Sequence, residues 1–227
     1  LKLKRAAKQL PIVSLTGPRQ SGKTTLVREV FKSYRYISLE LPDQRDFALH
    51  DPRGFLDQLD GPVILDEVQR APELFSYIQV LVDEHREWAG RFILTGSQNF
   101  LLLQSISQSL AGRCAVLHLL PFSLAELEGR KSMAPEAIAN AGVRRFQKRR
   151  RKLLETLFTG FYPRIHDKRL KPGDWLADYY QTYLERDVRN VLSVGDIEAF
   201  GRFMRLCAGR CGQLLNLSGL ASDCGIS

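Results

Sequence analysis

The sequence has no long hydrophobic run. Its apolar stretches, such as Val63–Leu65 and Ala115–Leu117, are far shorter than the roughly 20 residues that a helix needs to cross a bilayer. The first residues, LKLKRAAKQ, contain neither the apolar core nor the cleavage site of a secretory signal peptide. We therefore expect a soluble, cytoplasmic protein without a membrane partner. The sequence also lacks an initiator methionine, and we interpret it as a piece of a longer chain.

Cysteine is scarce. Four cysteines among 227 residues are too few for a fold that depends on disulfides. Cys207 and Cys211 stand four apart, with no Cys-x-x-Cys pair and no histidine close by, so a zinc site is not expected. We expect reduced and mostly buried thiols.

Positive charge is not spread along the chain, although the net charge is +8. Seven basic residues form one run without an acid among them, and the rest of the chain carries a net charge of only +1. This pattern excludes a basic field over the whole molecule. The run is either a solvated segment or a patch that binds a polyanion, and it consists of Arg144, Arg145, Lys148, Arg149, Arg150, Arg151 and Lys152.

The hydrophobic share of 44% and the charged share of 26% are ordinary for a globular protein. Up to about residue 120, short apolar runs alternate with amphipathic stretches, which is typical of a parallel sheet covered by helices. Strands are expected at Ile12–Thr16, Tyr36–Leu39, Val63–Asp66, Phe92–Thr95 and Ala115–Leu119. Helices are expected at Lys23–Lys32, Pro72–Glu87 and Asn99–Leu110.

After Pro121 the pattern is mainly helical up to residue 206. Three aromatic residues, Trp175, Tyr179 and Tyr183, share one helical face, and we expect them to pack a helical lid. Residues 131–151 are polar, basic and irregular, so we expect a disordered insert there. Near the end of the sequence, Ala221 followed four residues later by Gly225 fits the start of a helix-turn-helix.

A phosphate-binding motif follows the first expected strand. The run GPRQSGKT matches G-x-x-x-x-G-K-[ST] in full, between a strand and a helix. The glycines let the backbone wrap a phosphate, and the helix adds its positive end. Lys23 is expected to reach the β- and γ-phosphates, and Thr24 to offer its hydroxyl to Mg²⁺. The residues expected to bind the nucleotide here are Gly17, Pro18, Arg19, Gln20, Ser21, Gly22, Lys23, Thr24 and Thr25.

Two acids end the strand at residues 63–66. An apolar strand that ends in Asp66-Glu67 suits the carboxyl edge of the sheet, beside the phosphates. Asp66 is expected to hold Mg²⁺ through water. Glu67 is expected to be the general base for an attacking water.

The strand at residues 92–95 ends in hydroxyl and amide groups. In P-loop ATPases with a glutamate base this strand lies between the other two, so its tip faces the site. Ser97 is expected to contact the γ-phosphate or orient the water, with Thr95 and Asn99 behind it. Capping of the following helix by Ser97 or Asn99 is the alternative, and both roles can hold together.

Arg113 stands just before the last expected strand. An arginine there can reach the nucleotide of a neighbouring subunit as a finger. It can equally complement the dipole of the helix that it ends. The sequence leaves the two roles open.

The motifs together resemble those of prokaryotic AAA-like ATPases, within the group related to archaeal-type and signal-transducing (STAND) ATPases. The resemblance rests on LTGPRQSGKTT at 15–25, LDEVQ at 65–69, LTGS at 94–97 and SLAGR at 109–113. It implies an α/β P-loop fold with five parallel strands in the order 5-1-4-3-2, and it implies ATP and Mg²⁺ as ligands. Members are commonly followed by a helical lid, a winged helix and a restriction-nuclease-like domain.

The resemblance also suggests how the chain is divided. We expect the P-loop ATPase core at residues 1–125 and a helical lid at 126–206 with the basic insert at 131–152. Residues 207–227 are expected to begin a winged-helix domain that is cut off here. The run GFYP at 160–163 resembles the glycine-proline motif by which such lids close over adenine, so Pro163 is expected to contact the nucleotide.

Three functions remain open at this stage. The first is a Mg²⁺-dependent, ATP-hydrolysing switch. The second is a DNA-associated ATPase that uses the winged helix and the basic run, and the third is an interaction module that binds ATP without hydrolysing it. Glu67 argues against the third. The partners left open are a second copy of the chain, DNA and an unknown protein.

Overall fold

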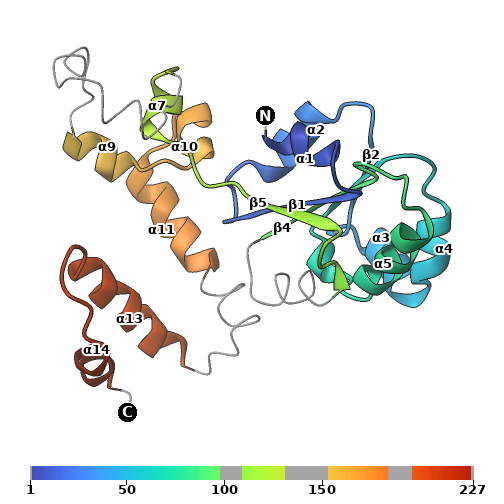
Figure 1. Ribbon diagram of the computed structural model, residues 1–227. Helices are drawn as coiled ribbons and strands as arrows, with labels where there is room; N and C mark the ends of the chain where they lie inside the picture. Colours follow the sequence, from blue (N-terminus) through green and yellow to red (C-terminus); the bar gives the residue numbers. More distant parts are fainter. Residues whose placement is uncertain (1, 98–108, 131–152, 184–195, 226–227) are drawn as a thin grey trace. The chain divides into compact units, whose positions relative to one another are not determined.

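The computed structural model describes residues 2–97, 109–130, 153–183 and 196–225 (Figure 1). By its internal contacts the chain divides into two compact units. The first comprises residues 1–150 and 161–168, and the second comprises residues 151–160 and 169–227. Each unit is described below by itself.

The first unit contains a five-stranded sheet. Its strands are β1 (Ile12–Gly17), β2 (Arg35–Ser38), β3 (Val63–Asp66), β4 (Phe92–Ser97) and β5 (Cys114–His118). All pair in parallel, in the order β2-β3-β4-β1-β5. The expected order 5-1-4-3-2 is confirmed, and every expected strand is found within two residues of its bounds.

Helices cover both faces of this sheet (Figure 1). Alternate strand residues point to opposite faces, so Ile12 and Phe92 join one buried cluster and Val13 and Ile93 join the other. The first cluster packs under α3 (Pro42–His50), α4 (Pro52–Asp57) and α5 (Leu74–Glu84). The second packs under α1 (Lys2–Ala7) and α2 (Lys23–Val30). Burial on both faces explains why the strands are apolar at successive positions.

Helices α1, α3 and α4 were not predicted. The last two are short and begin with Pro42 and Pro52 at the first helical turn, where the missing N–H of proline costs nothing. Asp51 caps α4 by accepting a hydrogen bond from the Gly54 N–H at 2.8 Å. These proline and cap signals were available in the sequence.

The remaining helices are mostly short. In the first unit they are α7 (Leu124–Leu127), which Ser123 and Glu126 cap reciprocally, and α10 (Pro163–Lys168). The second unit contains α9 (Leu153–Thr159), α11 (Pro172–Tyr183), α13 (Ile197–Gly209) and α14 (Leu217–Cys224). Helix α14 ends at Gly225, which has the left-handed backbone expected of a turn glycine. The winged helix remains a prediction.

Some expectations lie outside the described residues. These are the basic insert at 131–152, including the basic run, the role of Asn99, and most of the helix expected at Asn99–Leu110. All four cysteines are free, but only Cys224 is buried, so the expectation of mostly buried thiols is wrong. Within the described ranges, none of the helices has the length and apolar character needed to span a bilayer.

Candidate functional site

Residues 17–24, from the last residue of β1 to the first turn of α2, are called the phosphate loop below and have unusual backbone angles. Three of its residues have positive φ: Gly17 at 150°, Gln20 at 59° and Gly22 at 93°. A Cβ on Gly17 would lie 2.1 Å from the Leu119 carbonyl oxygen, so no other residue fits there. A Cβ on Gly22 would meet nothing within 4 Å, so space does not require a glycine there. The left-handed backbone of Gly22 at the start of α2 does favour one.

Lys23 is folded back over this loop. Its Nζ donates to the carbonyl oxygens of Gly17 at 3.0 Å and Pro18 at 2.9 Å. The side chain is buried, and burial lowers the pKa of the Lys23 ammonium, while the charges of Glu67 and Asp66 act to raise it. A buried cation thus lies within this loop, at the start of α2, where it suits an anion such as a phosphate.

The loop also contains an unsatisfied polar atom. Ser21 is buried, and its Oγ has no hydrogen-bond partner among the described residues. Such an atom costs stability unless a ligand satisfies it. Together with the cation of Lys23 and the open side of Gly22, the hydroxyl of Ser21 fits a loop that binds phosphate oxygens.

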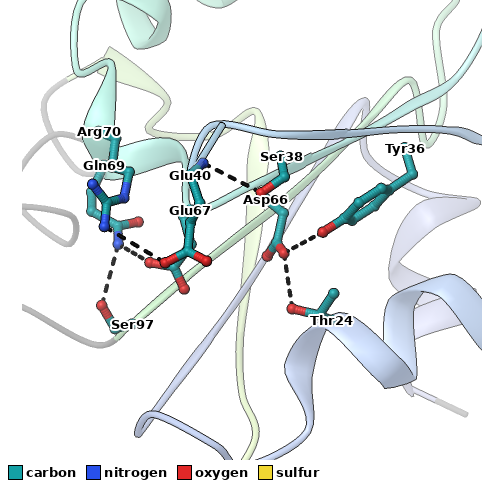
Figure 2. A network of polar contacts seen from close by, with 9 residues as sticks. All are labelled: Thr24, Tyr36, Ser38, Glu40, Asp66, Glu67, Gln69, Arg70 and Ser97. Atoms are coloured by element: carbon teal, nitrogen blue, oxygen red, sulfur yellow. Dashed lines mark hydrogen bonds and ion pairs between the residues drawn. The ribbon is translucent and has the colours of Figure 1, made fainter. Parts of the chain in front are cut away.

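Asp66 lies at the carboxyl end of β3 and accepts three hydroxyl hydrogen bonds, of which Figure 2 shows those from Thr24 and Tyr36. Thr24 donates to its Oδ2 at 2.9 Å and Tyr36 donates to the same oxygen at 2.7 Å. Thr95 donates to Oδ1. Three donors from α2, β2 and β4 therefore fix a buried carboxylate directly beside the phosphate loop.

Tyr36 was not predicted as a site residue. Tyr36 lies in β2, opposite Ile64 of β3, and its ring reaches along the sheet to Asp66. Burial and the hydrogen bond to Asp66 raise the pKa of Tyr36 to about 12, so the phenol remains a donor at neutral pH. Tyr36 also lines a cavity of about 510 Å³ beside α2, together with Thr24, Thr25 and Tyr34.

Tyr36→Phe is expected to lower the free energy of unfolding by about 1–3 kcal/mol, because a buried carboxylate loses a donor. Chemical denaturation measures this difference. Tyr34→Phe is the matched control, because Tyr34 lines the same cavity. Equal stability of the wild type and Tyr36→Phe would show that the contact with Asp66 contributes nothing.

Glu67 follows Asp66 with a left-handed backbone, φ 57° and ψ 44°, which is rare for a residue with a side chain. Burial raises the pKa of the Glu67 carboxyl; the hydrogen bond from Gln69 lowers it, and nearby Asp66 raises it. Gln69 Nε2 donates to Glu67 Oε2 and also to Ser97 Oγ at 3.2 Å (Figure 2). The candidate base is therefore held in place by a glutamine.

The structure brings most of the predicted residues to one edge of the sheet. Ser97 is the last residue of β4 and lies directly opposite Gly17 in the pairing of β1 and β4. The carboxyl end of β4 is therefore next to the phosphate loop. Thr95, expected behind Ser97, contacts Asp66. The set gathered there is Lys23, Thr24, Asp66, Glu67 and Ser97, with Tyr36 and Gln69 added by the structure.

Arg113 lies elsewhere, and the contact of Pro163 with the nucleotide remains a prediction. Arg113 stands at the start of β5, where its carbonyl accepts from the Ile12 N–H, at the amino edge of the sheet and opposite the phosphate loop. Its guanidinium forms a two-pronged ion pair with Asp83, at 2.5 and 2.7 Å. Pro163 is the first residue of α10. Just before it, the Phe161 carbonyl oxygen accepts a hydrogen bond from the Phe122 N–H, at 2.9 Å.

Thr24 and Asp66 supply hydroxyl and carboxylate oxygens, the ligand type that Mg²⁺ prefers. Their direct hydrogen bond shows that the two groups already face the same point. No cluster of three or more His, Cys, Asp or Glu side chains suited to a metal occurs in the described part of the chain. Two oxygen ligands of this kind suit a Mg²⁺ ion, which usually keeps several waters and also binds phosphate oxygens.

The fold and this site together define a P-loop nucleotide-binding protein. Residues 9–128 match the family model described as AAA domain, and the chain belongs to this family. Residues 150–227 match a domain of unknown function, DUF8612. The relation to STAND ATPases and the nuclease-like domain remain predictions.

Two relatives match the chain in sequence. They are the uncharacterized protein Rv2008c of Mycobacterium tuberculosis and the uncharacterized protein Mb2031c of Mycobacterium bovis. Each is 42% identical over 119 residues, which cover 52% of this chain. The match spans only 27% of the length of these relatives.

Solved structures similar to the chain include the following two. The Walker-type ATPase PABY2304 of Pyrococcus abyssi is 19% identical, with 58% of each chain covered and a TM-score of 0.39. The RuvB Holliday junction branch migration motor of Thermotoga maritima is 20% identical, with 100% of this chain and 80% of that chain covered and a TM-score of 0.42. Both TM-scores are low, so the conclusions below rest on the sheet and site of this chain.

Proposed function

We propose that this protein binds ATP with Mg²⁺ and hydrolyses it to ADP and phosphate. The observation that carries the proposal is the hydrogen bond from Thr24 to Asp66, at 2.9 Å. It joins the phosphate loop to the carboxyl end of β3, with the half-buried base candidate Glu67 as the next residue. Membership in the AAA domain family supports ATP as the nucleotide.

Each side chain has one role in the proposed reaction. Lys23 leaves its contacts with the loop carbonyls and binds phosphate oxygens. Glu67 accepts a proton from a water whose oxygen forms the new bond to the γ-phosphorus. The bond from that phosphorus to the bridging oxygen breaks, and ADP leaves with the electron pair. Ser97, which lies opposite Gly17 in the register of β1 and β4, would contact the γ-phosphate.

Thr24 and Asp66 would hold the magnesium ion. When bound there, it neutralises charge on the β- and γ-phosphates. The three hydroxyl donors keep Asp66 in one orientation, so the carboxylate needs no rearrangement when the ion binds.

A switch is the finer part of the proposal. Pro163 lies in the segment 161–168, which belongs to the first unit, while residues 151–160 before it and 169–227 after it belong to the second. A nucleotide that contacts Pro163 would touch a segment of the first unit that lies, in the sequence, between the two parts of the second unit. Hydrolysis could in this way change the state of the second unit.

The test is ATP hydrolysis by the purified protein, measured with and without Mg²⁺ and with and without duplex DNA. The proposal expects phosphate release that requires Mg²⁺ and occurs without DNA. Release only in the presence of DNA would favour a DNA-associated ATPase. ATP binding without release under any condition would favour a module that binds ATP without hydrolysing it.

Arg113 gives a separate prediction. Because Arg113 pairs with Asp83 at the opposite edge of the sheet, Arg113→Ala and Asp83→Ala are both expected to leave turnover per subunit within about 2-fold of wild type. Steady-state turnover over a range of protein concentrations measures this. A finger acting in trans predicts a fall of about 10³-fold in Arg113→Ala. It also predicts recovery on mixing with Glu67→Gln subunits, which would contradict our expectation.

A further inference from the structure

Gln69 connects two residues of the proposed reaction. One amide nitrogen donates both to Glu67 Oε2 and to Ser97 Oγ at 3.2 Å, so it links the carboxyl ends of β3 and β4 (Figure 2). No other side-chain hydrogen bond to Glu67 is recorded among the described residues. The amide of Gln69 thus restrains the Glu67 carboxylate, whose backbone lies in the left-handed region.

In the orientation of the Gln69 amide, Nε2 donates two hydrogen bonds, whereas Oε1 accepts none among the described residues. Gln69 Oε1 is buried and has no hydrogen-bond partner among the described residues. The large majority of buried side-chain polar atoms in proteins have a hydrogen-bond partner, so this unsatisfied oxygen asks for a reason. An unsatisfied acceptor kept in exchange for two donated hydrogen bonds is typical of a residue held for function.

The backbone of Gln69 is fixed independently of these bonds. It lies in the 3-10 helix Val68–Arg70, whose turns are closed by Arg70 N–H to the Glu67 carbonyl at 3.0 Å and by Ala71 N–H to the Val68 carbonyl at 3.1 Å. Val68 is fully buried, and Arg70 pairs with Glu40 at 3.6 Å. The amide is thus presented from a rigid turn, so its loss would release Glu67 without unfolding the turn.

The geometry points to Gln69 as a positioning residue for hydrolysis: its amide nitrogen holds the Glu67 carboxylate and the Ser97 hydroxyl in one arrangement around the attacking water. This inference rests on the proposed function. Gln69 acts through Glu67 and Ser97 and touches no phosphate. Its loss should therefore lower turnover while leaving nucleotide affinity unchanged.

Gln69→Met tests this, because methionine keeps the length of the side chain and removes both donors. We expect kcat to fall about 10- to 100-fold, the scale of effect that a misplaced catalytic group produces. The dissociation constant of a fluorescent ATP analogue should change by less than about 3-fold, because the phosphate loop is intact. In Glu67→Gln the same change should lower kcat by less than about 2-fold, because residues that act as a unit are not additive.

Two further variants complete the experiment. Gln58→Met is the matched control, since Gln58 is an exposed glutamine that ends α4. Gln69→Glu keeps the shape but places a second carboxylate beside Glu67, so its kcat should fall at least as far as that of Gln69→Met. Should Gln69→Met fail to fold, Gln69→Glu is judged by the same three measurements, with thermal unfolding as the check on the fold.

The outcomes separate this inference from the proposed function. Wild-type kcat in the Gln69 variants, with kcat lost in Glu67→Gln, would overturn the inference alone. Equal losses of kcat, affinity and thermal stability would also overturn it, because they indicate a structural residue. Wild-type protein that binds ATP and releases no phosphate would overturn the proposed function, and the inference with it.

Discussion

Glu67→Gln is expected to bind ATP as tightly as the wild type and to hydrolyse it at least about 100-fold more slowly. Glutamine keeps the shape of the side chain but cannot take a proton from water. The phosphate loop, Lys23 and Thr24 are untouched, so binding energy from the phosphates is retained. Turnover with excess ATP and titration of a fluorescent ATP analogue measure the two effects separately.

Glu84→Gln is the control for this change. Glu84 is an exposed glutamate that ends α5, so its loss should leave both turnover and affinity as in the wild type. Wild-type turnover in Glu67→Gln would remove Glu67 from the mechanism. A large loss of ATP affinity would show that Glu67 supports the site rather than the chemical step.

Lys23→Ala is expected to weaken both affinity and turnover. Its ammonium is a buried cation within the loop, and a hydrogen bond from a charged group contributes about 1.5–3 kcal/mol, or roughly 10- to 100-fold in affinity. Turnover should fall at least as far, because the same charge stabilises the phosphates as negative charge moves to ADP. Equilibrium binding and steady-state turnover measure both losses.

Lys32→Ala controls for the loss of a nearby positive charge. Lys32 lies just beyond α2, is exposed and pairs with Glu29 at 2.7 Å. Exposed pairs of this kind contribute little, so this variant should behave as the wild type. Unchanged ATP affinity in Lys23→Ala would mean that the loop binds phosphate without its lysine, and would contradict the site as described.

The sheet and the phosphate site were predictable because they depend on local patterns. The glycines at 17 and 22, with Lys23 and Thr24, follow a strand at a fixed spacing. In a parallel sheet, strands that carry polar groups at their ends bring those groups to the same edge. That rule placed Asp66, Glu67 and Ser97 together before any contact was known.

The network around the acids was not predictable, since it depends on register and on turn geometry. Tyr36 reaches Asp66 only because β2 and β3 pair with Ser38 opposite Asp66. Gln69 reaches Ser97 only because Glu67 adopts a left-handed backbone and the chain then turns in a 3-10 helix. A strained conformation at a non-glycine residue has no signature in the sequence.

The role of Arg113 could not be predicted from the sequence either. Its place before the last strand was apparent, but the same place puts it at the amino edge, roughly a strand length of 15–20 Å from the phosphate loop of its own chain. Its partner, Asp83, comes from α5, 30 residues earlier in the chain. A contact over that separation could not be inferred from either segment alone.

The most direct test of the central claim is a single-turnover measurement. The wild-type protein in excess over γ-labelled ATP is mixed with Mg²⁺, and bound ATP and released phosphate are followed over time. We expect the wild type to convert bound ATP to ADP and phosphate, whereas on Glu67→Gln the ATP should stay bound and intact. ATP that remains intact on the wild-type protein, or phosphate release of equal rate in both proteins, would contradict this expectation.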